Sequence, residues 1–386
     1  MRRTVWLAAA GLALLVPALA AADDKKPAKP ELANYFPPPE SKGGWRSLLP
    51  DKGEPSAAQK EDILKKTGVD WDKLNEAWKH NANVEGGSGV LVIRKGYVVG
   101  EWYKDATPTT AFNIYSSSKA YTSLAFGLLL KDSEDGKLPG NKKLTLDTKV
   151  CTKEWLPEAL PLPDERKADI TLRHLLNMAS GLGADNMPTD KEPFEIALGH
   201  TEKSPFAKLK DDPGKKFFYS NAGVAHLVLV FNHAAGKDLY PYLKERVFEP
   251  VGMEKVTWTQ IGGKDGKIGP YSQGFSGVNT TPREHARFLY LALHKGEWNG
   301  KQVVPAAHYD FAWKSSEANP QYGAQWWVYP RHKDGPKDLV QTAGANNNHG
   351  YVVPSMDLVF VRLGDGKKFP QNWEQDFVKQ VLAAMK

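Results

Sequence analysis

The sequence predicts an α/β chain of the α+β type, with an antiparallel sheet flanked by helices and a mainly helical insertion. β-Branched and aromatic residues form a hairpin pattern at 89–93 and 97–103, and strand patterns return only near the end of the chain. Between them, from about 130 to 300, the periodicity is helical. We therefore expect residues of about 80–115 and 320–386 to share one sheet, with a site in the cleft beside the insertion.

The first 22 residues predict a signal peptide. Arg2 and Arg3 precede an apolar run at 5–16, and small residues at 18–22 suit cleavage. Either the general or the twin-arginine export route fits this pattern. Because no later run of the sequence approaches the roughly 20 apolar residues of a transmembrane helix, we expect a periplasmic or secreted protein with no stable membrane insertion.

Residues 23–60 are rich in lysine and proline and are expected to form an extended linker, followed by one domain at 61–386. The chain has 386 residues, of which 41% are hydrophobic, so it can bury a sizeable core. Its one cysteine, Cys151, excludes an intramolecular disulfide. The net charge is +6, but basic and acidic residues are interspersed without a basic block, so nucleic acid is not an expected partner.

The elements of the domain are expected in the following order. A helical pattern at 62–78 precedes the hairpin, whose turn contains Gly96. A helix then begins at Ser116 and ends before Asp135. Residues 281–284 are expected to form a capping box with proline at the first helical position. Further helices are expected at 172–178, 222–235, 283–293 and 371–385, and further strands at 324–329, 339–343, 351–353 and 358–363.

Ser116 and Lys119 are the candidate nucleophile and base. Three residues apart on a helix is about one turn, so the two side chains share a face. A serine hydroxyl needs a base within hydrogen-bond reach, and a partly desolvated lysine amine can serve as that base. The start of a helix also favours developing negative charge. Taken alone the spacing is weak, because roughly one or two such pairs arise by chance in a chain of this length. The alternative is a serine cap beside a solvated lysine.

The sequence lacks the motifs of several other kinds of catalytic chemistry. No Gly-x-Ser-x-Gly elbow occurs in the sequence, so the usual scaffold of an α/β-hydrolase triad is missing. The ten histidines form neither His-Glu-x-x-His nor a cluster with cysteine. Glycine-rich phosphate loops are also absent. We therefore expect no metal and no cofactor.

Two further motifs follow the serine and lysine in order. Tyr219-Ser220-Asn221 is the only Tyr-x-Asn in the chain, and Thr342-Ala343-Gly344 ends a late strand pattern. With Ser-x-x-Lys, this order resembles the serine β-lactamase and penicillin-binding protein superfamily. The chain is most similar to its class C-related branch, which includes D-alanyl-D-alanine carboxypeptidases, esterases and nylon-oligomer hydrolases. Further segments resemble landmarks of the family, at 112–115, 144–147, 170–176, 180–182, 252–253, 298–301 and 304–305.

The resemblance implies a β-lactamase/transpeptidase-like fold and a role for each motif residue. Ser116 would be the nucleophile that forms an acyl-enzyme. Lys119 and Tyr219 would shuttle protons, and which of them is the general base stays open. Asn221 would orient the lysine and the substrate. The backbone N–H groups of Ser116 and Ala345 would form an oxyanion hole.

The third motif departs from the family pattern. A lysine or histidine usually begins this triplet before its Gly344, whereas here Thr342 stands there, or Gln341 if the alignment shifts by one. Without that positive charge, recognition of a substrate carboxylate is weakened. Residues 346–350 are expected to turn into the next strand, with His349 serving the turn, or else facing the cleft.

The resemblance thus implies an exported serine hydrolase acting on a small ester or amide, and the expected partner is a small-molecule ester, amide or peptide-like substrate. A class C-like β-lactamase or a D-alanyl-D-alanine carboxypeptidase is the alternative within the enzymes. The alternative outside them is a catalytically idle, ligand-binding member of the fold.

Overall fold

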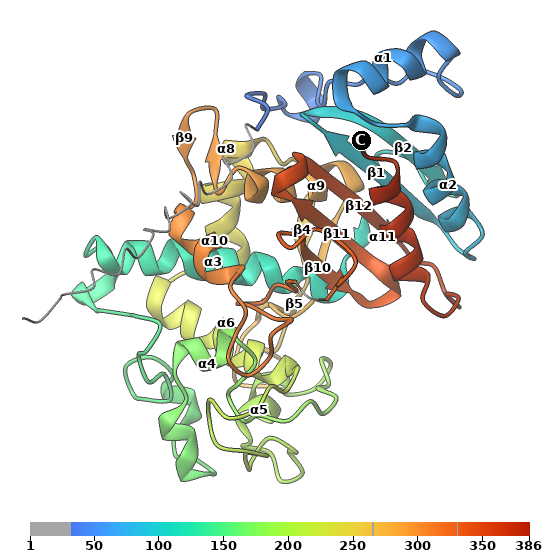
Figure 1. Cartoon of the computed structure of the whole chain (residues 1–386). Helices are drawn as coiled ribbons and strands as arrows, with labels where there is room; N and C mark the ends of the chain where they lie inside the picture. The colour runs from blue at the N-terminus through green and yellow to red at the C-terminus, as the bar shows by residue number, and fades with distance from the viewer. Residues whose placement is uncertain (1–31, 265, 330) are drawn as a thin grey trace, which may run out of the picture.

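A five-stranded sheet forms the frame of the molecule. The computed structural model describes residues 32–264, 266–329 and 331–386, so the expected signal peptide lies outside the described residues. The strand order is β10-β11-β12-β1-β2, and every neighbouring pair is antiparallel. The early hairpin thus lies beside the last strand, as Figure 1 shows, which confirms the predicted fold class. The strands are β1 (Ser88–Arg94), β2 (Tyr97–Lys104), β10 (Val340–Gly344), β11 (Asn348–Val353) and β12 (Leu358–Gly364).

Both faces of this sheet are buried. Because successive side chains of a strand point to opposite sides, neighbouring residues of one strand pack into different clusters. Val90 and Val92 of β1 belong to a cluster with helices α2 (Trp71–Ala82) and α11 (Trp373–Ala383). Leu91 and Ile93 belong to the main core, which includes α9 (Pro282–Leu293). In Figure 1 α2 and α11 lie on the same side of the sheet. The sheet is therefore the middle layer between helices.

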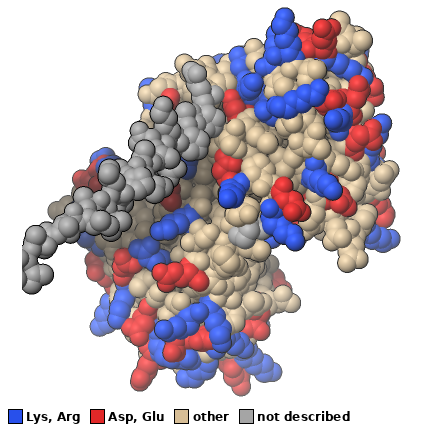
Figure 2. Space-filling model, viewed as in Figure 1, with Lys and Arg blue, Asp and Glu red and all other residues tan. Residues whose placement is uncertain are grey.

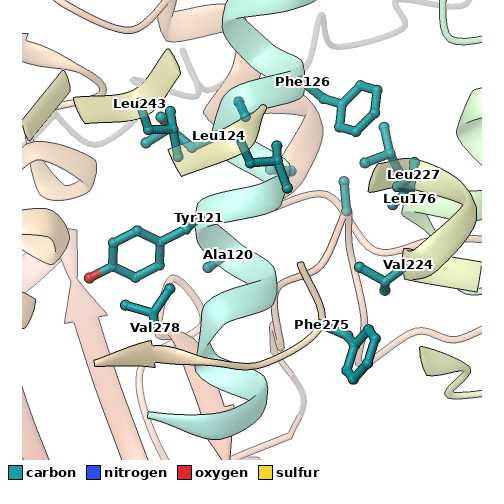
Figure 3. Packing of buried hydrophobic residues seen from close by; sticks show 14 of the residues in the cluster. Ala120, Tyr121, Leu124, Phe126, Leu176, Val224, Leu227, Leu243, Phe275 and Val278 are labelled. Atoms are coloured by element: carbon teal, nitrogen blue, oxygen red, sulfur yellow. The ribbon is translucent and has the colours of Figure 1, made fainter. Parts of the chain in front are cut away.

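Helix α3 (Ser118–Glu134) lies at the centre of the molecule, between the sheet and the helical part. It is buried along most of its length. Its side chains point in several directions in Figure 3, where Tyr121 and Phe126 lie on different sides of the helix. A 3-10 turn, Tyr115–Ser117, leads directly into α3. The first turn of this buried helix is therefore a fixed position for the residues that precede it.

The helical part contains short elements around α6 (Asn221–Ala235). The remaining helices are α1 (Ala57–Thr67), α4 (Leu172–Leu176), α5 (Pro193–Leu198), α7 (Leu239–Leu243), the π-helical turn Lys244–Phe248, α8 (Glu249–Val251) and α10 (Ala306–Ala312). The remaining strands are β3 (Phe112–Asn113), β4 (Val256–Trp258), β5 (Gln260–Ile261), β6 (Tyr271–Ser272), β7 (Val278–Thr280), β8 (Glu297–Trp298) and β9 (Lys301–Gln302). Other 3-10 turns are Glu40–Lys42, Pro139–Asn141, Pro157–Ala159, Glu165–Asp169, Ala345–Asn347 and Pro354–Met356.

The extended linker expected at 23–60 is wrong for residues 32–60, which are the part that the structure describes. The fully buried Arg287 of α9 donates hydrogen bonds to the carbonyl oxygens of Pro37 and Pro38, at 2.7 and 2.8 Å. Ser56 caps α1, which begins at Ala57, before the expected domain boundary. A buried guanidinium needs acceptors, and the proline-rich segment provides them. Composition alone did not reveal this tertiary contact.

Two local expectations also differ from the structure. No strand forms at 324–329, where only isolated bridges join Trp327 to Tyr322 and to Gln341. The capping box at 281–284 is half formed, since the Thr281 side chain accepts from the Glu284 N–H. The Glu284 carboxylate instead accepts N–H groups of Glu254 and Lys255.

The charged side chains are mixed in sign on the face shown in Figure 2. Lysine and arginine lie among aspartate and glutamate there, and no large field of one sign covers the visible face. Among the helices of the described ranges, none has the length and apolar character needed to cross a bilayer.

Candidate active site

Ser116 lines an open cleft between the helical part and the sheet. It occupies the 3-10 turn before α3, and the preceding Tyr115 has a positive φ of 48°. The Tyr115 N–H donates to the Asn113 side chain at 2.8 Å, which helps to hold this conformation. The cleft has a volume of about 440 Å³. Its lining residues are Ser116, Tyr219, Trp327, Arg331, Ala343, Gly344, Ala345, Asn346, Asn347, His349, Phe369 and Glu374.

Only the first of the three adjacent serines lines this cleft. The buried Ser117 hydroxyl donates to the Asn348 carbonyl oxygen at 2.6 Å. The buried Ser118 hydroxyl accepts the Val278 N–H at 3.1 Å. Both therefore hold the start of α3 against neighbouring strands, whereas Ser116 remains available to a ligand.

Lys119 lies beside the Ser116 hydroxyl inside the protein. Its Nζ is 3.0 Å from Ser116 Oγ, 2.8 Å from Asn221 Oδ1 and 2.8 Å from the Phe275 carbonyl oxygen. The side chain is 1% exposed, and no carboxylate pairs with it among the described residues. Burial lowers the pKa of Lys119 to about 7, because desolvation disfavours the charged form.

This arrangement suits a neutral lysine that acts as a base. A neutral amine has two N–H donors and one lone pair. Asn221 Oδ1 and the Phe275 carbonyl oxygen are acceptors, so they take the two N–H groups. The lone pair is left for the third partner, Ser116, whose hydroxyl can donate to it. The geometry thus directs the serine proton toward the lysine.

Tyr219 remains protonated under conditions in which Lys119 is partly neutral. Burial raises the pKa of Tyr219 to about 12, against the opposing influence of the Ser116 hydroxyl and the Arg331 charge. A phenol with this pKa is a better proton donor than base at neutral pH. Its neighbour Ser220 caps α6 through the Gly223 N–H. The capped helix start fixes the position of the Tyr-x-Asn motif.

Gly344 allows strand β10 to approach the segment that leads into Ser116. A Cβ atom on Gly344 would lie 2.1 Å from the Ile114 carbonyl oxygen, so no larger residue fits without a shift of the backbone. Among the described residues, no acceptor is found for the backbone N–H of Ser116 or of Ala345. Both residues line the cleft, where these donors can meet a developing oxyanion.

Thr342 was expected to contact the substrate, and this expectation is wrong. Its side chain lies away from the cleft. It is fully buried, and its hydroxyl lies 3.1 Å from His285 Nε2 of α9. His285 Nδ1 in turn lies 3.0 Å from the Tyr121 hydroxyl. Because side chains alternate along β10, its neighbours Gln341 and Ala343 point to the other face of the strand.

His349 lies in β11 and lines the cleft, so the favoured expectation of a role in the turn is wrong and the alternative, that it faces the cleft, is confirmed. Its Nδ1 lies 2.9 Å from the Tyr351 hydroxyl and 3.3 Å from Glu374 Oε1. Burial lowers the pKa of His349, although Glu374 opposes this change. The Gln341 side chain joins the same network, donating to Glu374 and accepting from Arg331.

Among the residues of the cleft wall that sequence reasoning missed, Trp327, Arg331 and Glu374 form a connected group. The Trp327 ring stacks on the Tyr219 ring, with centroids 5.9 Å apart and planes 19° apart. The Arg331 guanidinium lies 4.3 Å from the Trp327 ring centroid and pairs with Glu374 at 3.1 Å. None of the three belongs to a motif, and Glu374 comes from the C-terminal helix. Only the fold brings them to Ser116.

No metal site accompanies this arrangement in the part of the chain that the structure describes, where no three histidine, cysteine, aspartate or glutamate side chains are grouped to hold an ion.

The comparison with protein families decides which family this arrangement represents. The family model described as Beta-lactamase matches residues 77–385. The chain belongs to the beta-lactamase family. This match includes Ser116, Lys119, Tyr219 and the β10 strand. The family is one of serine hydrolases, and it also contains proteins related to penicillin-binding proteins.

Curated relatives of this beta-lactamase family protein match only part of it. Protein flp of Staphylococcus aureus (strain MW2) is 26% identical over 209 residues, which are 51% of this chain and 40% of that protein. A penicillin-binding protein of Bacillus subtilis (strain 168) is 24% identical over 200 residues, which are 48% of this chain and 40% of that protein. The matches thus span less than half the length of these relatives.

Solved structures show the same fold at low sequence identity. The octameric penicillin-binding protein homologue from Pyrococcus abyssi has a TM-score of 0.59 and 19% identity, covering 85% of this chain and 78% of its own. EstCE1, described as a hydrolase with promiscuous acyltransferase activity, has a TM-score of 0.62 and 16% identity, covering 80% of this chain and 97% of its own.

Proposed function

We propose that this protein is an exported serine hydrolase that acts through an acyl-enzyme on a small ester or amide. The observation that carries the proposal is the pair of Ser116 and Lys119, 3.0 Å apart, with the lysine desolvated. A lysine whose pKa is lowered to about 7 is neutral in about half of the molecules at neutral pH, so it can take the serine proton.

The reaction follows from these positions. Ser116 Oγ bonds to the substrate carbonyl carbon while its proton moves to Lys119 Nζ. The electron pair of the C=O bond moves to the oxygen, which the N–H groups of Ser116 and Ala345 stabilise. When this oxyanion collapses, the bond to the alcohol or amine breaks, and the leaving group takes the proton from Lys119, directly or through Tyr219. An acyl ester of Ser116 remains.

Water completes the cycle by the same route. It attacks the acyl carbon and gives a proton to the neutral Lys119, and the second oxyanion collapses to expel Ser116 Oγ. The serine takes the proton back as the carboxylic acid leaves. Asn221 Oδ1 and the Phe275 carbonyl oxygen hold the lysine through both halves of the cycle.

Two further observations support parts of the proposal. EstCE1, which has a similar fold, is described as a hydrolase with promiscuous acyltransferase activity. Export is supported by the sequence pattern of the first 22 residues alone.

The test is active-site labelling with a fluorophosphonate, followed by intact mass spectrometry. We expect one adduct on the wild type and none on Ser116→Ala. Ser118→Ala is the matched control, because its hydroxyl is bonded to the Val278 N–H and is expected to leave labelling intact. An unlabelled wild type, under conditions that label a related esterase, would favour the ligand-binding alternative and reject the enzyme.

A class C-like β-lactamase or D-alanyl-D-alanine carboxypeptidase is the second candidate, favoured by the similarity to a penicillin-binding protein. Nitrocefin and 4-nitrophenyl acetate separate the candidates. We expect turnover of the ester and slow or no turnover of nitrocefin. Rapid nitrocefin turnover with poor ester hydrolysis would support the β-lactamase instead.

A further inference from the structure

A second pocket lies along the outer edge of strand β2, away from Ser116. It has a volume of about 570 Å³, which is within the range of small-molecule sites, about 300–1,000 Å³. One side is formed by α2 and β2, and the other by the segment 47–55 that leads into α1. Strands β2 and β10 are the two edges of the five-stranded sheet (Figure 1). Four interstrand spacings, about 19 Å, therefore separate the strand beside this pocket from the strand beside the cleft.

Three indole rings are gathered at this pocket. Trp71 and Trp78 are seven residues apart on α2, which is about two turns, so they lie on the same face of the helix. Trp102 of β2 is close to both, because its ring centroid is 6.1 Å from that of Trp71 and 6.0 Å from that of Trp78. The planes of the Trp78 and Trp102 rings are only 7° apart. Both rings are half-buried and line the pocket, so part of this nearly parallel pair is open to a ligand.

Gly100 leaves room for the Trp102 ring on β2. A Cβ atom on Gly100 would lie 2.4 Å from two atoms of this ring and 3.0 Å from Leu74 Cδ2 of α2. The ring thus occupies the space beside a residue without a side chain, where it packs against the helix. An aromatic surface that is already in place costs a ligand little in ordering of side chains.

The pocket also contains polar groups that the fold leaves without partners. Asn75 follows Trp71 by one turn of α2, lines the pocket and is only 7% exposed. Its side-chain amide makes no hydrogen bond with a described residue, and neither do the indole N–H groups of Trp78 and Trp102. Because buried polar groups are normally hydrogen-bonded, the Asn75 amide points to a ligand that both donates and accepts hydrogen bonds.

The charged groups at this pocket favour a neutral ligand. Glu101 accepts two hydrogen bonds from Arg283, both at 2.7 Å, and one from the Tyr103 hydroxyl at 2.7 Å. The paired carboxylate and guanidinium present no net charge. Lys60 Nζ already lies 4.9 Å from the Trp71 ring centroid, so a cationic ligand at the indole rings would be repelled by this lysine.

We propose that this pocket binds a neutral saccharide. The C–H faces of a pyranose ring are apolar and match the rings of Trp78 and Trp102, whereas its hydroxyl groups can bond to the Asn75 amide and to the Glu101–Arg283 pair. Saccharide binding here is independent of the chemistry at Ser116. Since the pocket and the cleft lie at opposite edges of the sheet, a bound glycan holds the protein while the cleft stays open to its own substrate.

Isothermal titration calorimetry with neutral pentasaccharides tests the proposal. The probes are cellopentaose, maltopentaose and N-acetylchitopentaose, and we expect at least one of them to bind saturably at a single site. Trp78→Ala should weaken that binding at least tenfold, because it removes one of the two parallel rings, and Trp78→Phe should retain part of it. Trp313→Ala is the matched control, since Trp313 is also half-buried but packs against Trp326 outside this pocket. It should bind like the wild type.

Asn75→Leu separates ligand binding from damage to the fold. Because the Asn75 amide has no partner among the described residues, its removal breaks no hydrogen bond within the protein. The variant should therefore keep or raise the unfolding free energy in urea, while it weakens saccharide binding at least tenfold. A variant that loses stability and binding together would show that the amide supports the fold, and would contradict the proposal.

The remaining outcomes decide the site and the class of ligand. The proposal is overturned if none of the three saccharides binds, or if Trp78→Ala and Asn75→Leu leave binding unchanged. Tetramethylammonium and decaproline are competing probes, and tighter binding of either one than of every saccharide would show that the ligand class is wrong. Ser116→Ala should bind the saccharide like the wild type, and a loss of binding there would place the ligand in the cleft instead. Fluorophosphonate labelling of Ser116 should be the same in Trp78→Ala and the wild type, so this proposal and the hydrolase function can fail separately.

Discussion

Replacing Lys119 by methionine should make the stability of the protein respond differently to pH. The wild type keeps a buried amine whose pKa is lowered from 10.5 to about 7 by desolvation. Below pH 7 both the folded and the unfolded chain hold the proton, and the full cost of burying the charge is present. Between pH 7 and 10.5 the unfolded chain binds more protons, so the stability of the wild type rises with pH.

The size of this effect follows from the two pKa values. Their difference of about 3.5 corresponds to about 5 kcal/mol in total. From pH 7 to pH 10 the wild type should gain about 4 kcal/mol that Lys119→Met does not gain. The variant also leaves the Asn221 and Phe275 oxygens without a hydrogen-bond donor, which lowers the unfolding free energy by about 1–3 kcal/mol for each oxygen. That penalty shifts the absolute stability, but it does not change with pH.

The assay is urea unfolding of both proteins at several values between pH 6 and pH 10. The difference in unfolding free energy, variant minus wild type, should fall steadily above pH 7. Lys167→Met is a matched comparison, because Lys167 is also buried, bonds to the Leu198 carbonyl oxygen and has a pKa lowered to about 8. The difference in unfolding free energy between Lys167→Met and the wild type should therefore begin to fall about one pH unit higher. A Lys119→Met difference that is constant across this range would refute the lowered pKa.

Two other substitutions test how β10 is fixed. Gly344→Ala should lower kcat about 100-fold, because its Cβ would lie 2.1 Å from the Ile114 carbonyl oxygen and displace the strand. Gly223→Ala is the control and should stay active, since its Cβ would lie 3.6 Å from the nearest atom. Equal kinetics of the two variants would contradict this prediction. Thr342→Val should lower the unfolding free energy in urea by about 1–3 kcal/mol, because it leaves His285 Nε2 without its partner. Thr342→Ser should retain that stability, and a loss as large as in the valine variant would show that the hydroxyl is not responsible.

The parts of the fold that the sequence predicted are those encoded by local pattern. The β-branched and aromatic runs at 89–93 and 97–103 became β1 and β2, and their apolar side chains pack into the cores on both faces of the sheet. The Ser116 to Lys119 spacing predicted a shared helical face, and the two side chains do meet. Such features depend on residues close in sequence, where periodicity and capping leave a signal.

The features that were missed depend on contacts between distant segments. The lysine- and proline-rich stretch at 23–60 looks like a linker in the sequence, but buried Arg287 of α9 donates to the carbonyl oxygens of Pro37 and Pro38 within it. Arg331 and Glu374 carry no motif, and their pairing requires the loop before β10 and the C-terminal helix to meet. Thr342 was assigned to the cleft by its place in a motif, although the alternation along β10 turns its side chain to α9.

The measurement that tests the central claim most directly is the pH dependence of Ser116 acylation. The rate of fluorophosphonate labelling, followed by intact mass between pH 5 and pH 10, reports the step in which Lys119 takes the serine proton. The neutral-lysine mechanism predicts a rate that rises with pH, reaches half its maximum near pH 7 and then stays level. A rate that is flat across this range, or that is still rising at pH 10 toward the ordinary pKa of a lysine, would contradict it.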